Sequence, residues 1–168
     1  MLILPCNILA DPGQVSEYEV KAAFLYNFAK FVEWPESNLK NLDSLEICVF
    51  GSNPFGNHLE SIVSGKTAQE KAIKISYTSN IGKIQNCQIL FVADNDKNQT
   101  EKILEATSEL PILTVSDLSD FASKDGIIGF YTEDNRIRFE VNRQKANNSG
   151  LSFSSRLLKI ARLVDSEE

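Results

Sequence analysis

Histidine is almost absent from this chain of 168 residues, because His58 is its only one. A single histidine excludes metal sites built from several imidazoles, and it weakens any case for Ser–His or Cys–His catalysis. No pair of carboxylates stands out with the spacing of a catalytic loop. We therefore expect a protein that is not an enzyme, with no cofactor or metal, and we expect His58 to lie on the surface.

Long apolar runs and basic runs are also missing. No segment reaches the roughly 20 apolar residues of a membrane-spanning helix, so no direct membrane insertion is expected. The net charge is −6 and Lys and Arg form no run. Nucleic acids and anionic membranes attract clustered Lys and Arg, so neither is expected as the main partner.

The first ten residues are apolar and uncharged. Residues 1–10 look like part of a secretory signal peptide, with Ala10 before a loose cleavage site, although the usual basic start is missing. A strand is the alternative, and a lipoprotein acylated at Cys6 is a weaker one. We expect residues 11–17 to form a flexible lead-in, residues 18–165 to form a single domain, and the mature protein to be periplasmic.

Helical and strand patterns alternate along the rest of the chain. Apolar residues at a helical period predict a helix over 18–34 that Pro35 ends. Further helices are expected at 55–64, 97–109, 117–124 and 152–164, and strands at 45–50, 73–77, 88–93 and 111–115. This alternation predicts an α/β fold, a three-layer sandwich in which helices cover both faces of a mostly parallel sheet.

Asp134-Asn135 predicts the turn of a C-terminal antiparallel hairpin between residues 126–132 and 136–141. A two-residue loop pairs Phe130 with Phe139, Ile128 with Val141 and Thr132 with Ile137, which gives one apolar face. The opposite face would carry Tyr131, Arg136, Arg138 and Glu140, all directed outward.

Two short motifs suggest ligands. Ser64-Gly-Lys-Thr67 lacks the glycine that a phosphate-binding loop needs five residues earlier, where Glu60 stands. The turn from Gly51 to Gly56, with Asp94 and Asp96, follows strands where α/β folds bind ligands. A small-solute-binding sensory module is therefore an alternative function, although tight connections and solvated loops explain these residues as well.

Removal of residues 1–10 would leave two cysteines, Cys48 and Cys87. An even pair in an exported protein suggests a disulfide. The two residues belong to strands that are neighbours in the common 2-1-3 strand order, so the thiols could meet. Two buried free thiols are the alternative.

Two stretches of the chain resemble the YfiR-like family. Val20-Lys-Ala-Ala-Phe-Leu-Tyr-Asn-Phe-Ala-Lys-Phe-Val-Glu-Trp-Pro35 is similar to its opening helix. Arg138-Phe-Glu-Val-Asn142, with Ala146 and Gly150-Leu-Ser-Phe-Ser-Ser-Arg-Leu-Leu158, is similar to its closing signature.

The resemblance implies a periplasmic protein that represses a membrane-bound diguanylate cyclase, YfiN, and tends to form homodimers. A sensor kinase is the alternative partner. The Cys48–Cys87 pair matches the family's stabilising bridge, whereas a second family bridge has no counterpart here. The resemblance implies Glu140, Ala146 and Ile128 for partner binding, and Ser154 and Arg156 for a small ligand. Arg138, on the same outward face of the hairpin as Glu140, is a further partner-binding candidate. For Ile128, which falls on the apolar face of the hairpin, packing is the alternative. For Arg156, an ion pair on the helix surface is the alternative.

Overall fold

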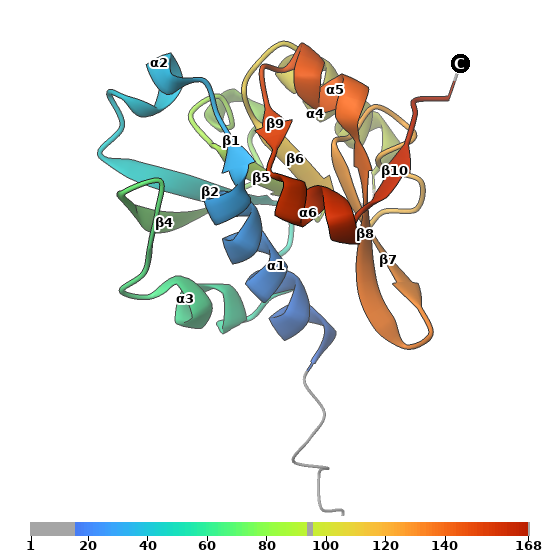
Figure 1. The fold of residues 1–168 in the computed structure, drawn as a ribbon, viewed down its shortest axis with the longest axis horizontal. Helices are drawn as coiled ribbons and strands as arrows, with labels where there is room; N and C mark the ends of the chain where they lie inside the picture. Colours follow the sequence, from blue (N-terminus) through green and yellow to red (C-terminus); the bar gives the residue numbers. More distant parts are fainter. Residues whose placement is uncertain (1–15, 94–95, 168) are drawn as a thin grey trace, which may run out of the picture.

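The computed structural model describes residues 16–93 and 96–167, and a mixed sheet forms its centre (Figure 1). The order of its eight strands is β10-β8-β7-β6-β5-β2-β4-β3. These strands are β2 (Ser44–Phe50), β3 (Thr67–Ala68), β4 (Lys71–Thr78), β5 (Ile89–Val92), β6 (Leu113–Ser116), β7 (Ile128–Glu133), β8 (Arg136–Asn142) and β10 (Arg162–Val164). Neighbouring strands are parallel except in the pairs β7–β8 and β3–β4. The expected mostly parallel sheet is confirmed.

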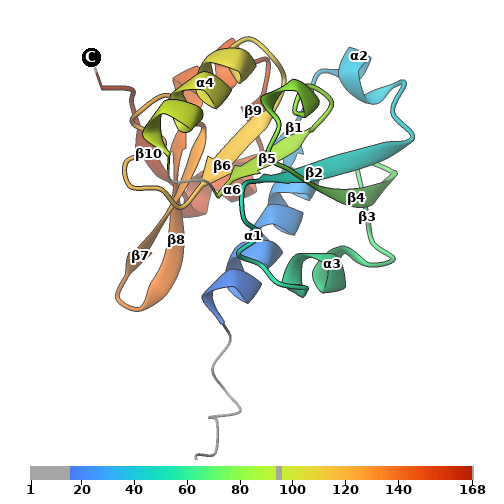
Figure 2. The ribbon, with the colours of Figure 1, turned by 180° about the vertical axis from the view of Figure 1, so that it is seen from behind.

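Helices cover both faces of this sheet, as Figure 1 and its reverse view in Figure 2 show. They are α1 (Glu17–Phe31), α2 (Glu36–Leu39), α3 (His58–Val63), α4 (Lys97–Thr107), α5 (Arg143–Asn148), α6 (Ser155–Ile160) and the short 3-10 helix η1 (Ile81–Lys83). Along β2, Ile47 and Val49 belong to the apolar cluster that contains the buried residues of α1, whereas Phe50 packs in a second cluster with Ile103 of α4. This alternation confirms the three layers, because successive strand residues point to opposite faces.

Helix α1 is shorter than the apolar pattern predicts. It begins after Ser16, whose hydroxyl accepts a hydrogen bond from the Glu19 amide, and it ends at Phe31 instead of Trp34. The next two residues form β1 (Val32–Glu33), which pairs antiparallel with β9 (Ser152–Phe153). The residue before a proline avoids helical backbone angles. The pairing with β9 gives hydrogen-bond partners to the backbone of this extended segment. Trp34 itself is buried in the core.

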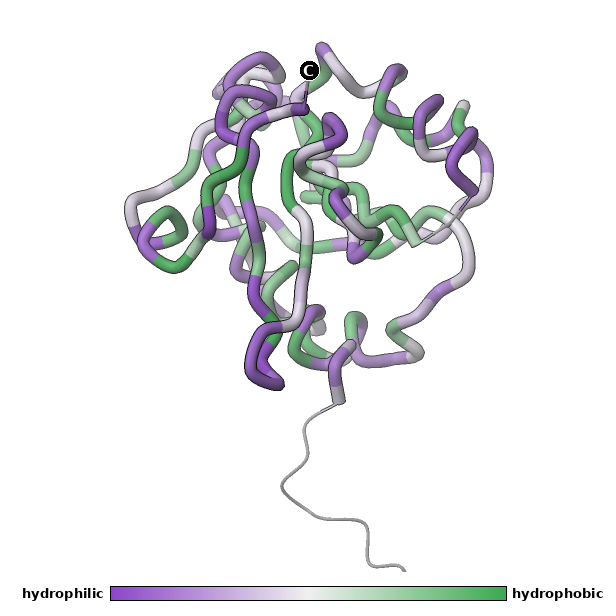
Figure 3. The backbone as a smooth tube through the Cα atoms, turned by 90° about the vertical axis from the view of Figure 1, so that its right-hand side faces the viewer, coloured by the Kyte–Doolittle hydropathy of each residue, from purple (hydrophilic) through white to green (hydrophobic). Residues whose placement is uncertain are grey.

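The C-terminal hairpin has the register that the sequence predicts. Phe130 pairs with Phe139, Ile128 with Val141 and Thr132 with Ile137. Asp134 and Asn135 both have positive φ, at 51° and 59°, as a type I′ turn requires. Hydrophilic residues mark the hairpin tip, while apolar residues concentrate in the inner strands (Figure 3).

Two helices expected from the sequence are wrong in extent or kind. Residues 117–124 form turns instead of a helix, and Asp120 has a left-handed φ of 60° that interrupts helical geometry. The helix expected over 152–164 is confined to α6, because its two ends are extended as β9 and β10 and pair with distant strands. Helix α5, which Asn142 caps, was not expected.

Candidate functional site

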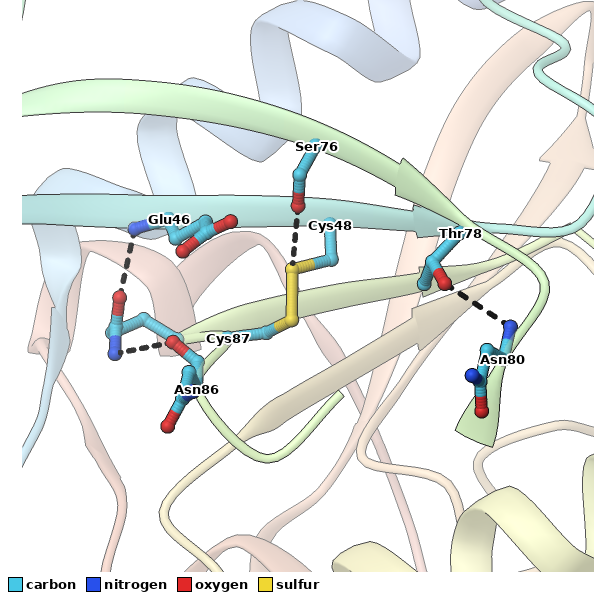
Figure 4. Close-up of a disulfide and its surroundings, with 8 residues drawn as sticks. Glu46, Cys48, Ser76, Thr78, Asn80, Asn86 and Cys87 are labelled. Atoms are coloured by element: carbon cyan, nitrogen blue, oxygen red, sulfur yellow. Dashed lines mark hydrogen bonds between the residues drawn. A yellow bond between two sulfur atoms is a disulfide. The ribbon is translucent and has the colours of Figure 1, made fainter. Parts of the chain in front are cut away.

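A disulfide joins Cys48 to Cys87, with 5.9 Å between their Cα atoms (Figure 4). Cys48 lies in β2, and Cys87 lies just before β5, which pairs with β2. The expected pairing is therefore confirmed, and so is the strand order β4-β2-β5 from which it was inferred. Ser76 in β4 donates a hydrogen bond to the Cys48 sulfur at 3.2 Å, and both cysteines are buried in the apolar cluster that contains Ile103 of α4.

Glu140 lies on the hairpin face that looks away from the core, but it is only 8% exposed. The expectation that it points freely outward is wrong, because β10 pairs with β8 in parallel and places Arg162 beside it. The Arg162 guanidinium donates to Glu140 Oε2 from Nε at 3.1 Å and from a terminal nitrogen. This hydrogen bond raises the pKa of Arg162. The same guanidinium stacks 3.9 Å from the centroid of the Tyr131 ring.

The other partner-binding candidates divide into one surface residue and two core residues. Arg138 lies opposite Tyr131 on the outer face of the hairpin, and its Nε is 4.0 Å from a Glu133 carboxylate oxygen. Ile128 and Ala146 are fully buried. A partner could therefore contact Arg138 directly, whereas the two buried residues act only by shaping the backbone around them.

The two ligand-binding candidates lie at the start of α6. The Ser154 hydroxyl accepts a hydrogen bond from the Leu157 amide and so caps the helix. The Arg156 guanidinium carbon lies 5.7 Å from the centroid of the Phe31 ring. In the described part of the chain no carboxylate lies within ion-pair distance of Arg156, so the alternative of a surface ion pair is replaced by a cation–π contact.

A buried lysine forms the centre of a polar cluster that the sequence did not predict. Lys21 is 2% exposed and forms ion pairs with Glu17 and, at 2.8 Å, with Asp117. The Tyr18 hydroxyl donates to the same Asp117 oxygen at 2.7 Å. Burial and this hydrogen bond raise the pKa of Tyr18. The sequence held one sign of this cluster. Lys21 lies on the same helix face as Leu25 and Phe28, where an apolar residue is normal.

The ion pairs of Lys21 and the Glu140–Arg162 ion pair line one cavity of about 380 Å³. Lys21 lines it from α1, Asp117 from the position just after β6, and Glu140 and Arg162 from β8 and β10. In α/β folds, ligands bind at the carboxyl ends of strands. The cavity offers charges of both signs, which suits a small polar solute that carries both.

The turn from Gly51 to Gly56 and Asp96, which suggested a ligand site, have structural roles. Asn53 accepts a hydrogen bond from the Phe55 amide and donates one to the Gly56 carbonyl, so the turn satisfies its own polar groups. Asp96 caps α4, and Asp94 lies outside the described residues. His58 is partly exposed at the start of α3, with Ser16 Oγ 3.4 Å from its Nε2.

Nowhere in residues 16–93 and 96–167 do three His, Cys, Asp or Glu side chains gather as a metal site requires. Within the same ranges, no helix has the length and apolar character that crossing a bilayer demands.

These features define an α/β domain whose sheet ends in an antiparallel hairpin and whose central strands share a disulfide. The model of the YfiR/HmsC-like family matches residues 18–162, and the chain belongs to this family. The family is regulatory and is known for a periplasmic repressor of the diguanylate cyclase YfiN. No curated protein matches the chain.

Proposed function

We propose that this chain is a periplasmic regulatory protein that binds the periplasmic part of a membrane-bound diguanylate cyclase and represses it. The observation that carries this proposal is the family match over residues 18–162. The Cys48–Cys87 disulfide supports it, because disulfides persist in oxidising compartments such as the periplasm.

Cellular cyclic di-GMP is the direct test of repression. Deletion of the gene in its native host should raise cyclic di-GMP, and wild-type protein supplied in trans should lower it again. An unchanged level after deletion would show that the partner is not a cyclase, and the periplasmic part of a sensor kinase would be tested next.

Arg138 offers the sharpest test of the partner surface, because it lies on the outer hairpin face and is partly exposed. Arg138→Glu should weaken capture of the cyclase's periplasmic domain and leave the thermal midpoint within a few degrees of the wild-type value. Lys74→Glu is the matched control, since Lys74 is an exposed residue of β4 at the other end of the sheet. Equal loss in both variants would contradict a site on the hairpin.

The periplasmic location has its own measurement, a thiol count by mass spectrometry on protein from the native host. The expected product lacks residues 1–10, which lie outside the described residues, and holds Cys48 and Cys87 as a disulfide. Retained Met1 with two free thiols would indicate a reducing compartment and would remove the basis for periplasmic regulation.

The cavity of about 380 Å³ favours a second candidate function, a sensory module that binds a small solute. Its charges suit amino acids or nucleotides, which should raise the thermal midpoint by mass action if they bind. Lys21 and Arg162 line the cavity, so Arg162→Ala should abolish such a shift without removing a buried side chain. No stabilisation by either class at millimolar concentration would eliminate this candidate.

A further inference from the structure

Basic side chains are concentrated near the C-terminal end of this acidic chain. Residues 136–163 contain seven of the 17 Lys and Arg residues but only one of the 23 Asp and Glu residues. The segment therefore has a formal charge of seven minus one, or +6, and the rest of the chain has ten minus 22, or −12. The seven residues are Arg136, Arg138, Arg143, Lys145, Arg156, Lys159 and Arg162.

Two large apolar side chains are exposed within the same segment. Ile160, at the end of α6, is 60% exposed, and Leu163, in β10, is 52% exposed. Among the described residues, Tyr77 is the one other large apolar side chain with comparable exposure. Single exposed leucines are ordinary, but these two residues are close in the chain and are flanked by the cations Lys159 and Arg162.

A groove and a strand edge adjoin Leu163, and Ile160 lies two residues before the edge strand begins. Strand β10 is the last strand of the sheet, and among the described strands it pairs with β8 alone (Figure 1). A hollow of about 540 Å³ lies between β10 and α5. Its lining includes Leu163, Arg143 and the amide side chains of α5, together with one carboxylate, Asp165.

We propose that the edge of β10 and the adjoining groove form a docking surface for an acidic polypeptide segment that also carries apolar side chains. We call this the β10 surface and define it by Arg143, Lys159, Ile160 and Leu163. Its cations complement carboxylates, the two apolar residues provide anchors, and a strand edge can pair with an extended backbone. That this segment belongs to the cyclase rests on the proposed function, whereas the proposal of the β10 surface does not depend on that function.

Charge argues against a symmetric dimer through this surface. A symmetric dimer through the β10 surface would bring the same patch from both copies together, so cations would face cations. Anionic lipid is also disfavoured, because a strand edge and a groove lined by amides offer hydrogen bonds that suit a polypeptide backbone.

The test measures fluorescence anisotropy of a labelled short peptide of alternating Glu and Val, with the Lys and Val version as its partner probe. Wild-type protein should bind the acidic peptide, and salt should weaken this binding. The double variant Arg143→Glu/Lys159→Glu should lose roughly tenfold in affinity, about the effect of 1.4 kcal/mol. The matched variant Lys74→Glu/Lys102→Glu, which reverses two exposed lysines on other elements, should bind as the wild type does.

Leu163→Ser tests the apolar anchor and should also weaken peptide binding.

Four results would overturn the proposal. Three concern the peptides: no binding of the acidic peptide, equal binding of both peptides, or equal loss in the two double variants. The fourth is that Arg143→Glu/Lys159→Glu still binds the acidic peptide but loses binding to phosphatidylglycerol vesicles or loses self-association. The cyclase experiment is separate, so acidic-peptide binding without any effect on cyclic di-GMP would keep the surface and reject the cyclase as its partner.

Discussion

At the scale of single residues, Lys21 is the most unusual position in the described chain. Its ammonium group is buried and is neutralised by Glu17 on its own helix and by Asp117, which lies 96 residues further along the chain. The Lys21 nitrogen also lies 4.5 Å from the centroid of the Tyr18 ring. A buried charge is tolerated only when it is paired, so this cluster ties α1 to the carboxyl end of β6.

Lys21→Met should lower the free energy of unfolding by about 2 kcal/mol, because it keeps the apolar stem but leaves Asp117 without its cation. Denaturant unfolding at neutral pH measures this loss. Lys30→Met is the matched control on the exposed side of α1 and should change the free energy by less than about 0.5 kcal/mol. Equal effects of the two substitutions would show that the buried ion pairs contribute no stability.

At the scale of elements, the hairpin β7–β8 carries both the outer-face candidates and the platform for β10. Its turn holds two residues with positive φ, a conformation that glycine adopts more easily than asparagine. The turn geometry also fixes the register that places Glu140 opposite Gly129.

Asn135→Gly should therefore stabilise the protein by about 0.5 kcal/mol, and Asn135→Val should destabilise it by about 1 kcal/mol or more, since branched side chains disfavour positive φ. The midpoints of denaturant unfolding distinguish the two variants. A glycine variant less stable than wild type would mean that the Asn135 side chain contributes more than its backbone strain costs.

These elements also show which parts of the fold and the site can be predicted from the sequence and which cannot. The hairpin register follows from local alternation and a two-residue turn, so the sequence predicts it residue by residue. Strands β1 and β9 could not be predicted, because each has only two residues and pairs with a distant segment, as Val32 does with Phe153, 121 positions later. The Lys21–Asp117 pair and the covering of Glu140 by Arg162 are hidden for the same reason, since each depends on contacts between distant segments.

At the scale of the whole molecule, the disulfide links β2 to the residues just before β5, its parallel neighbour in the sheet. Strand β2 has β4 on one side and β5 on the other, and the bridge closes the chain between Cys48 and Cys87, 39 positions apart. Closing a loop of this length restricts the unfolded chain and favours the folded state.

Cys48→Ala/Cys87→Ala should lower the free energy of unfolding by up to about 4 kcal/mol. The measurement is denaturant unfolding of the variant and of the wild type, each with and without reductant. Reductant should bring the wild type close to the variant and should leave the variant unchanged. A variant as stable as oxidised wild type would assign the bridge a role other than stability.

The burial of Trp34 has a practical consequence for these measurements. It is the chain's single tryptophan and follows β1 directly, so its indole emission reports on one known place. Emission from an indole in an apolar setting shifts to longer wavelength when water reaches it. A red shift that precedes loss of the far-ultraviolet signal would show that the short β1–β9 ribbon opens before the main sheet melts.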